Sequence, residues 1–375
     1  MTEARGRTPI LATTLLPGLG HLLIGSRASG SGLLAAWLAL SGTAVFARDR
    51  IRVAWSGSLD DRIALVTLVA GLVLLWGGAL YDVAVRRRRP RQPGGDSQWA
   101  IAGRRFRRSL PALAGLWILG ALYLAALLAP FLSPYDPIAL SNIVETSYLP
   151  PSFEHWLGTD RFGRDVLSRI IFGARISLAV GFIATAISIT VGTLIGAVAG
   201  YAGGPIDGAL MRFTDMVLSF PRLVLLLLMV ALFEPSLTVI VLVLGLTQWP
   251  GTTRIVRGDV LSLREREFIQ AGRALGFSHG RLVLRHLIPN VMAPIIVTAT
   301  LGIGNTIVLE ASLSFLSLGV PPPTPTWGEM VAGGRDNLIG AWWVSTFPGL
   351  VIVLVVLAFN LVGDGLRDAL DPRLR

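Results

Sequence analysis

The sequence predicts an all-α polytopic membrane protein, and three observations lead to this fold class. Of the 375 residues, 53% are hydrophobic and only 15% are charged, and the mean hydropathy is +0.64. The apolar residues form long runs instead of alternating with polar ones at globular spacing. The arginines lie in the gaps between these runs, as expected for cytoplasmic loops. Because this placement accounts for the net charge of +10, we expect a lipid bilayer as the surroundings and no nucleic-acid partner.

Two residue types are absent from the chain, and each absence excludes a class of site. No cysteine is present, which excludes disulfides, thiolate metal sites and cysteine nucleophiles. No lysine is present either, so all 33 basic residues are arginine. A Walker A loop needs a lysine at the nucleotide phosphates, so any ATP that drives this protein must be hydrolysed by another chain. The four histidines form no close metal-ligand pair, and we expect no metal, no cofactor and no catalytic residue in this chain.

Residues 1–85 are expected to form an accessory membrane module. The apolar run at residues 10–24 is interrupted by proline and glycine and has arginines on both sides, which favours an interfacial or re-entrant helix over a cleaved signal peptide. Residues 32–47 and 63–85 are apolar runs joined by a short polar loop. They predict two spans that form a hairpin.

Residues 86–108 are expected to be a cytoplasmic linker. They contain nine arginines, two prolines and a Gly-Gly pair, a composition typical of a flexible segment on the positively charged side of a membrane. The same charges would suit a docking site for anionic lipid. Both interpretations stay open at this point.

The remainder of the chain is expected to contribute six further spans. The first core helix and an external loop occupy residues 109–173, and the cytoplasmic tail occupies residues 365–375. The six predicted spans are residues 110–132, 177–200, 216–233, 237–249, 291–313 and 343–362. The fourth is too short for a bilayer, so it must recruit flanking residues such as Gly251 and Thr252. Alternation then places the arginine-rich loop 250–290 inside the cell, on the side that the positive-inside rule requires.

The second of these spans carries small residues at every fourth position, so that one helix face has almost no side chains. The five positions are Ala184, Ser188, Gly192, Gly196 and Gly200. Small residues allow another helix backbone to approach closely, so this face is a predicted packing seam. Packing within one subunit and packing between two subunits are equally compatible with the pattern.

A polar stretch at residues 264–290 lies between two of the apolar runs. Phe268, Ala271, Gly272 and Leu275 fall at helical spacing, and Gly276 follows where a glycine in the left-handed conformation would end a helix. A second helix is expected to begin after Ser278, a good N-cap residue, and to end at Pro289. The pattern predicts helix, sharp turn, helix. Both pieces are too short to cross a bilayer, and charge alone favours a solvated cytoplasmic loop.

The register of this stretch resembles the EAA loop of importer-type ABC transporter permeases. Two small residues, Ala271 and Gly272, are followed four positions later by Gly276 and then by a closing segment before Pro289. The usual glutamate is replaced by Gln270, and the usual second alanine by Gly272. Segments that begin at His155, Leu309, Trp342 and Gly363 also resemble the C-type permease of dipeptide and oligopeptide importers, so the resemblance extends over roughly residues 105–375.

The resemblance implies a fold, a location and a set of partners. The core would be the six-helix permease of a type I ABC importer, with residues 174–364 as the permease domain, in the cell membrane with the C-terminus in the cytoplasm. A homologous second permease would complete the path, two ATP-binding subunits would hold ATP and magnesium, and an external binding protein would deliver substrate. The short helix would dock into an ATPase subunit. The implied coupling residues are Phe268, Gln270, Ala271, Gly272, Leu275, Gly276 and Pro289.

Asn305 and Glu310 are candidates for the path or a gate, because ionisable residues inside predicted spans are commonly functional. Glu310 lies near the external end of its predicted span, where water or Arg335 could neutralise it. We therefore favour a structural or gate-packing role for Glu310 over substrate binding.

Two other classes of protein fit the composition. A self-contained secondary transporter would need coupling-ion ligands at membrane depth, and apart from Glu310 few acidic residues lie inside the predicted spans. An accessory or sensory membrane protein would explain the presence of the N-terminal module at residues 1–85. The sequence leaves the transported solute open, whether dipeptide, oligopeptide, nickel complex or another compound.

Overall fold

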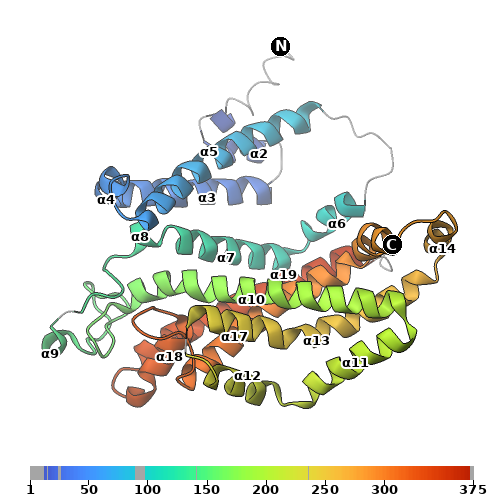
Figure 1. Ribbon diagram of the computed structural model, residues 1–375. Coiled ribbons are helices and arrows are strands. Elements are labelled where there is room, and N and C mark those ends of the chain that lie inside the picture. The colour runs from blue at the N-terminus through green and yellow to red at the C-terminus, as the bar shows by residue number, and fades with distance from the viewer. Residues whose placement is uncertain are drawn as a thin grey trace, which may run out of the picture. The chain divides into compact units, whose positions relative to one another are not determined.

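The computed structural model describes residues 12–14, 16–23, 27–88, 98–140, 142–234 and 236–371. These residues form helices and connecting segments and no β-strand (Figure 1). The chain divides into two compact units, one made of Met1–Asp96 and Leu124–Pro134 and the other of Ser97–Tyr123 and Tyr135–Arg375. The predicted all-α fold is confirmed.

The N-terminal unit is built around a pair of apolar helices. Its helices are α2 (Leu19–Leu23), α3 (Arg27–Phe46), α4 (Arg48–Ala54), α5 (Leu59–Arg88) and α8 (Ala129–Leu132). Residues of α3, α4, α5 and α8 share one hydrophobic cluster, which includes Leu40, Leu68 and Phe131. Arg50 donates hydrogen bonds to the carbonyls of Pro130 and Pro134. These carbonyls lie in and just after the short helix α8, where backbone carbonyls have no amide partner within the helix. The predicted helix at residues 10–24 lies partly outside the described residues, and within it residues 12–14 and α2 are helical.

The larger unit contains the predicted six-span core. Its helices are α6 (Gln98–Phe106), α7 (Leu110–Leu127), α9 (Ile143–Thr146), α10 (Val166–Ala202), α11 (Gly204–Ser219), α12 (Arg222–Ala231), α13 (Leu237–Arg264), α14 (Glu267–Ala274), α15 (His279–Arg281), η1 (Leu282–Leu287), α16 (Ile288–Asn290), α17 (Met292–Phe315), α18 (Trp327–Gly334), η2 (Arg335–Asn337) and α19 (Trp343–Leu370). The last four residues of α7 are grouped with the N-terminal unit. The long helices α10, α13, α17 and α19 run alongside one another (Figure 1).

Six of the described helices are long and apolar enough to cross a membrane, namely α5, α7, α10, α13, α17 and α19. They include five of the six predicted core spans. The predicted span 32–47 corresponds to α3, which meets α4 at a bend of 78°. The fourth core span recruits flanking residues as predicted, because α13 continues through Pro250 to Arg264.

The predicted span at residues 216–233 is not one continuous helix. Two helices, α11 and α12, meet there at a bend of 85°, as in a broken span or a re-entrant loop. The break falls at Phe220, which has ψ 133° and is followed by Pro221. A residue before proline is driven out of the helical region by the proline ring, so the helix cannot continue. Residues 204–215, which precede the predicted span, belong to α11.

Three predicted boundaries also differ from the structure. The linker 86–108 contains the helix α6, and α5 extends into it as far as Arg88. The tail 365–375 begins inside α19, which continues to Leu370. The loop 250–290 begins as the second half of α13. In each case the helix continues into polar residues beyond the apolar run. The prediction relied on hydropathy, so it placed the boundary at the end of the apolar run.

The predicted packing seam is the contact between α10 and α13 within one chain. All five of its small residues are buried. A Cβ atom added at Gly192 would lie 2.7 Å from the Trp249 carbonyl oxygen, and one at Gly196 would lie 2.6 Å from the Thr253 carbonyl oxygen. The Thr253 hydroxyl donates a hydrogen bond to the Gly192 carbonyl. The structure thus favours the intrasubunit alternative for these residues.

Replacing Gly196 with leucine is expected to destabilise the subunit by about 3 kcal/mol, since the added side chain meets backbone that cannot turn away. The measurement is the thermal unfolding midpoint of the purified subunit in detergent. Gly258 lies on α13 with open space at its Cβ position, so Gly258→Leu is the matched control. Equal midpoints for the two variants would contradict the assignment of this seam.

Candidate coupling site

The helix α14 has one face buried and the other exposed. Ile269 is fully buried and belongs to a cluster with Val256 and Val260 of α13 and with Leu282 and Leu287 of η1. On the opposite face Phe268 is 47% exposed and Leu275 is 74% exposed. Ala271, also exposed, lies between them at helical spacing. Three of the predicted coupling residues, Phe268, Ala271 and Leu275, therefore form an exposed apolar strip on a helix whose opposite face is buried.

The turn after α14 has the geometry that the glycine predicts. Gly276 has φ of 76°, in the left-handed region. The Phe277 amide donates to the Gly272 carbonyl, and the Gly276 amide donates to the Arg273 carbonyl, each at 3.0 Å. This pair of bonds is the Schellman arrangement, which satisfies the last carbonyls of a helix. Helix, sharp turn and helix are confirmed as predicted.

The two arms of this elbow are in close contact. A Cβ atom at Gly272 would lie 2.9 Å from Leu282 Cδ2 and 3.2 Å from Phe277 Cδ2. A side chain at this position would push α14 away from η1. The glycine that stands in place of the usual alanine therefore allows the arms to touch.

The second arm begins as predicted and then departs from a regular α-helix. The Ser278 hydroxyl accepts a hydrogen bond from the Arg281 amide, as an N-cap does. Residues Leu282–Leu287 wind as a π-helix before α16 and Pro289. A wider turn of this kind appears mostly as a single turn and frequently at functional sites.

The end of α10 also supports the elbow, which sequence reasoning did not anticipate. The Tyr201 hydroxyl is hydrogen-bonded to His279 Nδ1 at 2.7 Å, and the Arg273 guanidinium lies 5.0 Å from the centre of the Tyr201 ring. Arg264 donates to the Gly200 carbonyl and so ties the end of α13 to α10. Because these contacts join residues more than sixty positions apart, no local signal could have indicated them.

Gln270 is exposed, and its side-chain amide donates a hydrogen bond to the Glu265 carbonyl at 3.1 Å. An ionised glutamate at this position could only accept hydrogen bonds. Glutamine in place of the usual glutamate thus allows a side-chain hydrogen bond to the residues that precede α14. Pro289 is exposed and separated from the strip by the whole second arm.

The structure separates the two candidates for a path or gate. Asn305 is exposed on α17, whereas Glu310 is fully buried on a different face of the same helix. Glu310 accepts a hydrogen bond from the Ser314 hydroxyl, beside the close approach of Gly328 to Ala311. The expected pairing of Glu310 with Arg335 is not found, because Arg335 donates to the Phe315 carbonyl and to Asp336 instead.

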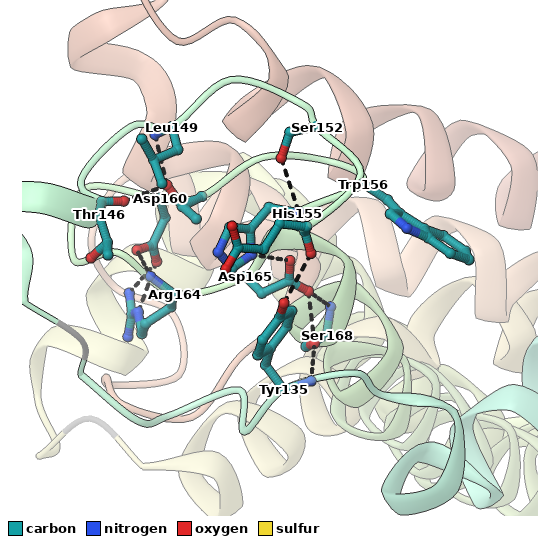
Figure 2. A network of polar contacts seen from close by, with 12 residues as sticks. Tyr135, Thr146, Leu149, Ser152, His155, Trp156, Asp160, Arg164, Asp165 and Ser168 are labelled. Atoms are coloured by element: carbon teal, nitrogen blue, oxygen red, sulfur yellow. Dashed lines mark hydrogen bonds and ion pairs between the residues drawn. The ribbon is translucent and has the colours of Figure 1, made fainter. Parts of the chain in front are cut away.

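A buried polar network that sequence reasoning missed lies at the other end of the core unit, in the segment before α10 (Figure 2). Asp160 pairs with Arg164 at 2.7 Å and lies 3.6 Å from Arg169, and Arg169 also pairs with Glu329 of α18 at 2.6 Å. Asp165 contacts His155 at 3.0 Å and caps α10 by accepting from the Ser168 amide. These contacts fix the loop before α10 to α18.

Tyr135 joins the loop to the start of α10 in the same network. Its hydroxyl donates to the Glu154 carbonyl at 3.0 Å, and its amide donates to the Ser168 hydroxyl. Desolvation raises the pKa of Tyr135, and the carboxylates of Glu154 and Asp165 raise it further. The hydroxyl consequently stays protonated and keeps its donor role at physiological pH.

Comparison with known proteins places the candidate coupling site within a matched segment, whereas residues 152–191, which carry most of the polar network, lie between two matched segments. The family described as "Binding-protein-dependent transport system inner membrane component" matches residues 192–375, and "N-terminal TM domain of oligopeptide transport permease C" matches residues 97–151. Three named relatives are similar to most of the chain.

The first of these relatives is the dipeptide transport system permease protein DppC of Alkalihalophilus pseudofirmus, which is 44% identical over 74% of this chain and 91% of the relative. DppC of Bacillus subtilis is 43% identical over 73% of this chain and 85% of the relative. The oligopeptide transport system permease protein OppC of Bacillus subtilis is 40% identical over 74% of this chain and 91% of the relative. Both family matches lie within residues 97–375, which contain the candidate coupling site.

Proposed function

Because this chain belongs to the dipeptide and oligopeptide permeases of the binding-protein-dependent ABC importers, we propose that it forms one half of a peptide translocation path. It is a multi-pass membrane protein whose fold is the all-α permease fold of that family. The exposed strip of Phe268, Ala271 and Leu275 on a braced elbow is the observation that carries the proposed coupling role.

The strip is suited to transmit force from an ATP-binding subunit. Phe268 and Leu275 would fill an apolar cleft of that subunit, and Ala271 would let the two backbones approach. Only Glu265 and Arg266 separate α14 from α13, and only Val291 separates α16 from α17. A displacement of α14 would therefore pass directly into two membrane-spanning helices.

The proposed assembly follows the family. A homologous permease would supply the other half of the path, and two ATP-binding subunits would bind ATP and magnesium on the cytoplasmic side. An external binding protein would present the peptide. In this assembly the present chain hydrolyses nothing and holds no cofactor, and its C-terminus lies in the cytoplasm.

The proposal is tested by truncating the strip in the assembled transporter. Phe268→Ala and Leu275→Ala are each expected to weaken ATPase-subunit binding by about 2 kcal/mol or more, as for apolar anchors at interface centres. Co-purification and peptide-stimulated ATP hydrolysis measure the effect. Leu284 is similarly exposed but lies on the second arm, so Leu284→Ala is the matched control.

Two outcomes would contradict the proposal. One is unchanged co-purification and unchanged ATP hydrolysis in both strip variants. The other is uphill uptake by this chain alone in vesicles, powered by an ion gradient, which would instead identify a secondary transporter.

A further inference from the structure

A polar cavity of about 650 Å³ lies at the end of the core unit that carries the candidate coupling site. Its lining comes from α6, α13, α17 and α19 and from the two ends of the coupling segment. Four charged side chains line it, namely Arg105, Asp259, Arg266 and Asp371. The cavity is thus lined by two guanidinium groups and two carboxylates, and Arg105 donates a hydrogen bond to the backbone carbonyl of Asp371 at 3.3 Å.

A second pocket, of about 350 Å³, adjoins the first and has the opposite character. Apolar residues of α6, α7, α17 and α19 dominate its lining, among them Phe106, Leu116 and Ile296. The two pockets share Ala102, Ala369 and Leu370 as lining residues. A polar chamber and an apolar chamber therefore adjoin at these residues, where α6 contacts α19.

The position of α6 places this pair of chambers at the membrane surface. The helix carries arginine in its last turn, and α7 begins four residues after α6 ends. Since α7 is apolar enough to cross the bilayer, α6 lies at headgroup depth. Residues at this depth are exposed to lipid headgroups on one side and to acyl chains on the other.

We propose that the two chambers together bind one membrane phospholipid with a zwitterionic amino headgroup, such as phosphatidylethanolamine. Arg105 and Arg266 would bind its phosphate, Asp259 and Asp371 would bind its ammonium group, and the apolar pocket would hold one acyl chain. The equal number of guanidinium and carboxylate groups suits a zwitterion better than a purely anionic headgroup. The combined volume lies in the range of small-molecule sites.

The site also touches both ends of the coupling segment. Arg266 is the residue before α14, and Asn290, at the end of α16, lines the same cavity. A bound lipid would brace the two points at which the segment joins α13 and α17. This consequence rests on the proposed coupling function, whereas lipid binding itself does not.

The test uses the purified transporter complex and a phosphatidylethanolamine that carries a diazirine in one acyl chain. Light-induced labelling of the wild-type permease is expected to map to α6 and the end of α19. Arg105→Gln combined with Arg266→Gln should reduce labelling at least tenfold. Arg212 is exposed on α11 and lines neither chamber, so Arg212→Gln should leave it unchanged.

The apolar chamber is tested separately by filling it. Gly103 lines this pocket, and a Cβ atom there would meet nothing within 4 Å. Gly103→Phe should therefore occupy the chamber without straining the fold and reduce labelling at least tenfold. Gly120 on α7 has similarly open space and lies outside the pocket, so Gly120→Phe should label as the wild type does.

Four results would overturn the proposal. They are equal labelling of all variants, stronger labelling by a matched phosphatidylglycerol probe, equal competition by chain-free glycerophosphoethanolamine, and labelling of the isolated subunit that is lost in the complex. Equal labelling would show that there is no site, and stronger labelling by phosphatidylglycerol would show that the site does not select a zwitterion. Equal competition by glycerophosphoethanolamine would show that the apolar chamber binds no acyl chain. Labelling that is lost in the complex would show that the site is not available beside the ATPase subunit. Loss of peptide uptake plays no part in these readouts, so failure of the coupling function would be seen independently.

Discussion

Replacing Gly276 with valine is expected to reduce peptide uptake by about tenfold or more while the subunit still reaches the membrane. Gly276 has φ of 76°, and a residue with a Cβ atom costs about 1–2 kcal/mol in this left-handed conformation. The penalty comes from the backbone alone, because an added Cβ would meet nothing within 4 Å. Relief of this strain would open the elbow and displace α14 from η1.

The control for this prediction is Gly280→Val. Gly280 lies four residues later on the second arm, with equally open space at its Cβ position and no positive φ. Uptake and peptide-stimulated ATP hydrolysis should be measured together in proteoliposomes. We expect hydrolysis without uptake in the Gly276 variant and normal coupling in the Gly280 variant. Full uptake by the Gly276 variant would show that the left-handed turn is dispensable.

Replacing Arg169 with methionine is expected to destabilise the permease by about 3–5 kcal/mol, the usual cost of removing one partner from a buried ion pair. The Arg169 side chain is 1% exposed and contacts Glu329, Asp160 and the Pro137 carbonyl. Its removal leaves the Glu329 carboxylate without the guanidinium that pairs with it, whereas Asp160 keeps its contact with Arg164. The measurement is the thermal unfolding midpoint of the purified subunit in detergent.

Two further variants separate the loss of pairing from the loss of one arginine. Arg161 is exposed and stacks on Phe162 at 4.6 Å, so Arg161→Met should lower the midpoint only slightly. Glu329→Gln combined with Arg169→Met should recover part of the loss, since the stranded charge is removed as well. An Arg169→Met midpoint equal to that of the wild type would refute the role of this network.

The candidate coupling site was largely predictable because its signals are local. A glycine in the left-handed conformation ends α14, and the Ser278 hydroxyl starts the second arm. Such signals act within about one helical turn and need no distant partner. The buried face of α14 was harder to predict from the sequence, because Ile269 is covered by residues of α13 and η1.

The buried polar network before α10 shows where such prediction stops. Arg169 and Glu329 are 160 positions apart in the sequence. No local sequence pattern indicates that the two side chains pair. Glu310 is similar, since its burial depends on α18 packing against α17. A single sequence records which groups are ionisable but not which of them meet.

The sequence by itself determined that this protein is helical and membrane-spanning and where the elbow turns, and it predicts that any use of ATP needs another chain. Hydropathy, helix caps and the absence of lysine are properties of single residues or short runs, so they can be read without a fold. Only the tertiary structure decided that the small-residue seam of α10 faces α13, that Arg169 meets Glu329, and that a polar and an apolar chamber adjoin beside α6. These contacts depend on how distant helices pack, because the free energy of a contact belongs to both partners and is encoded in neither alone.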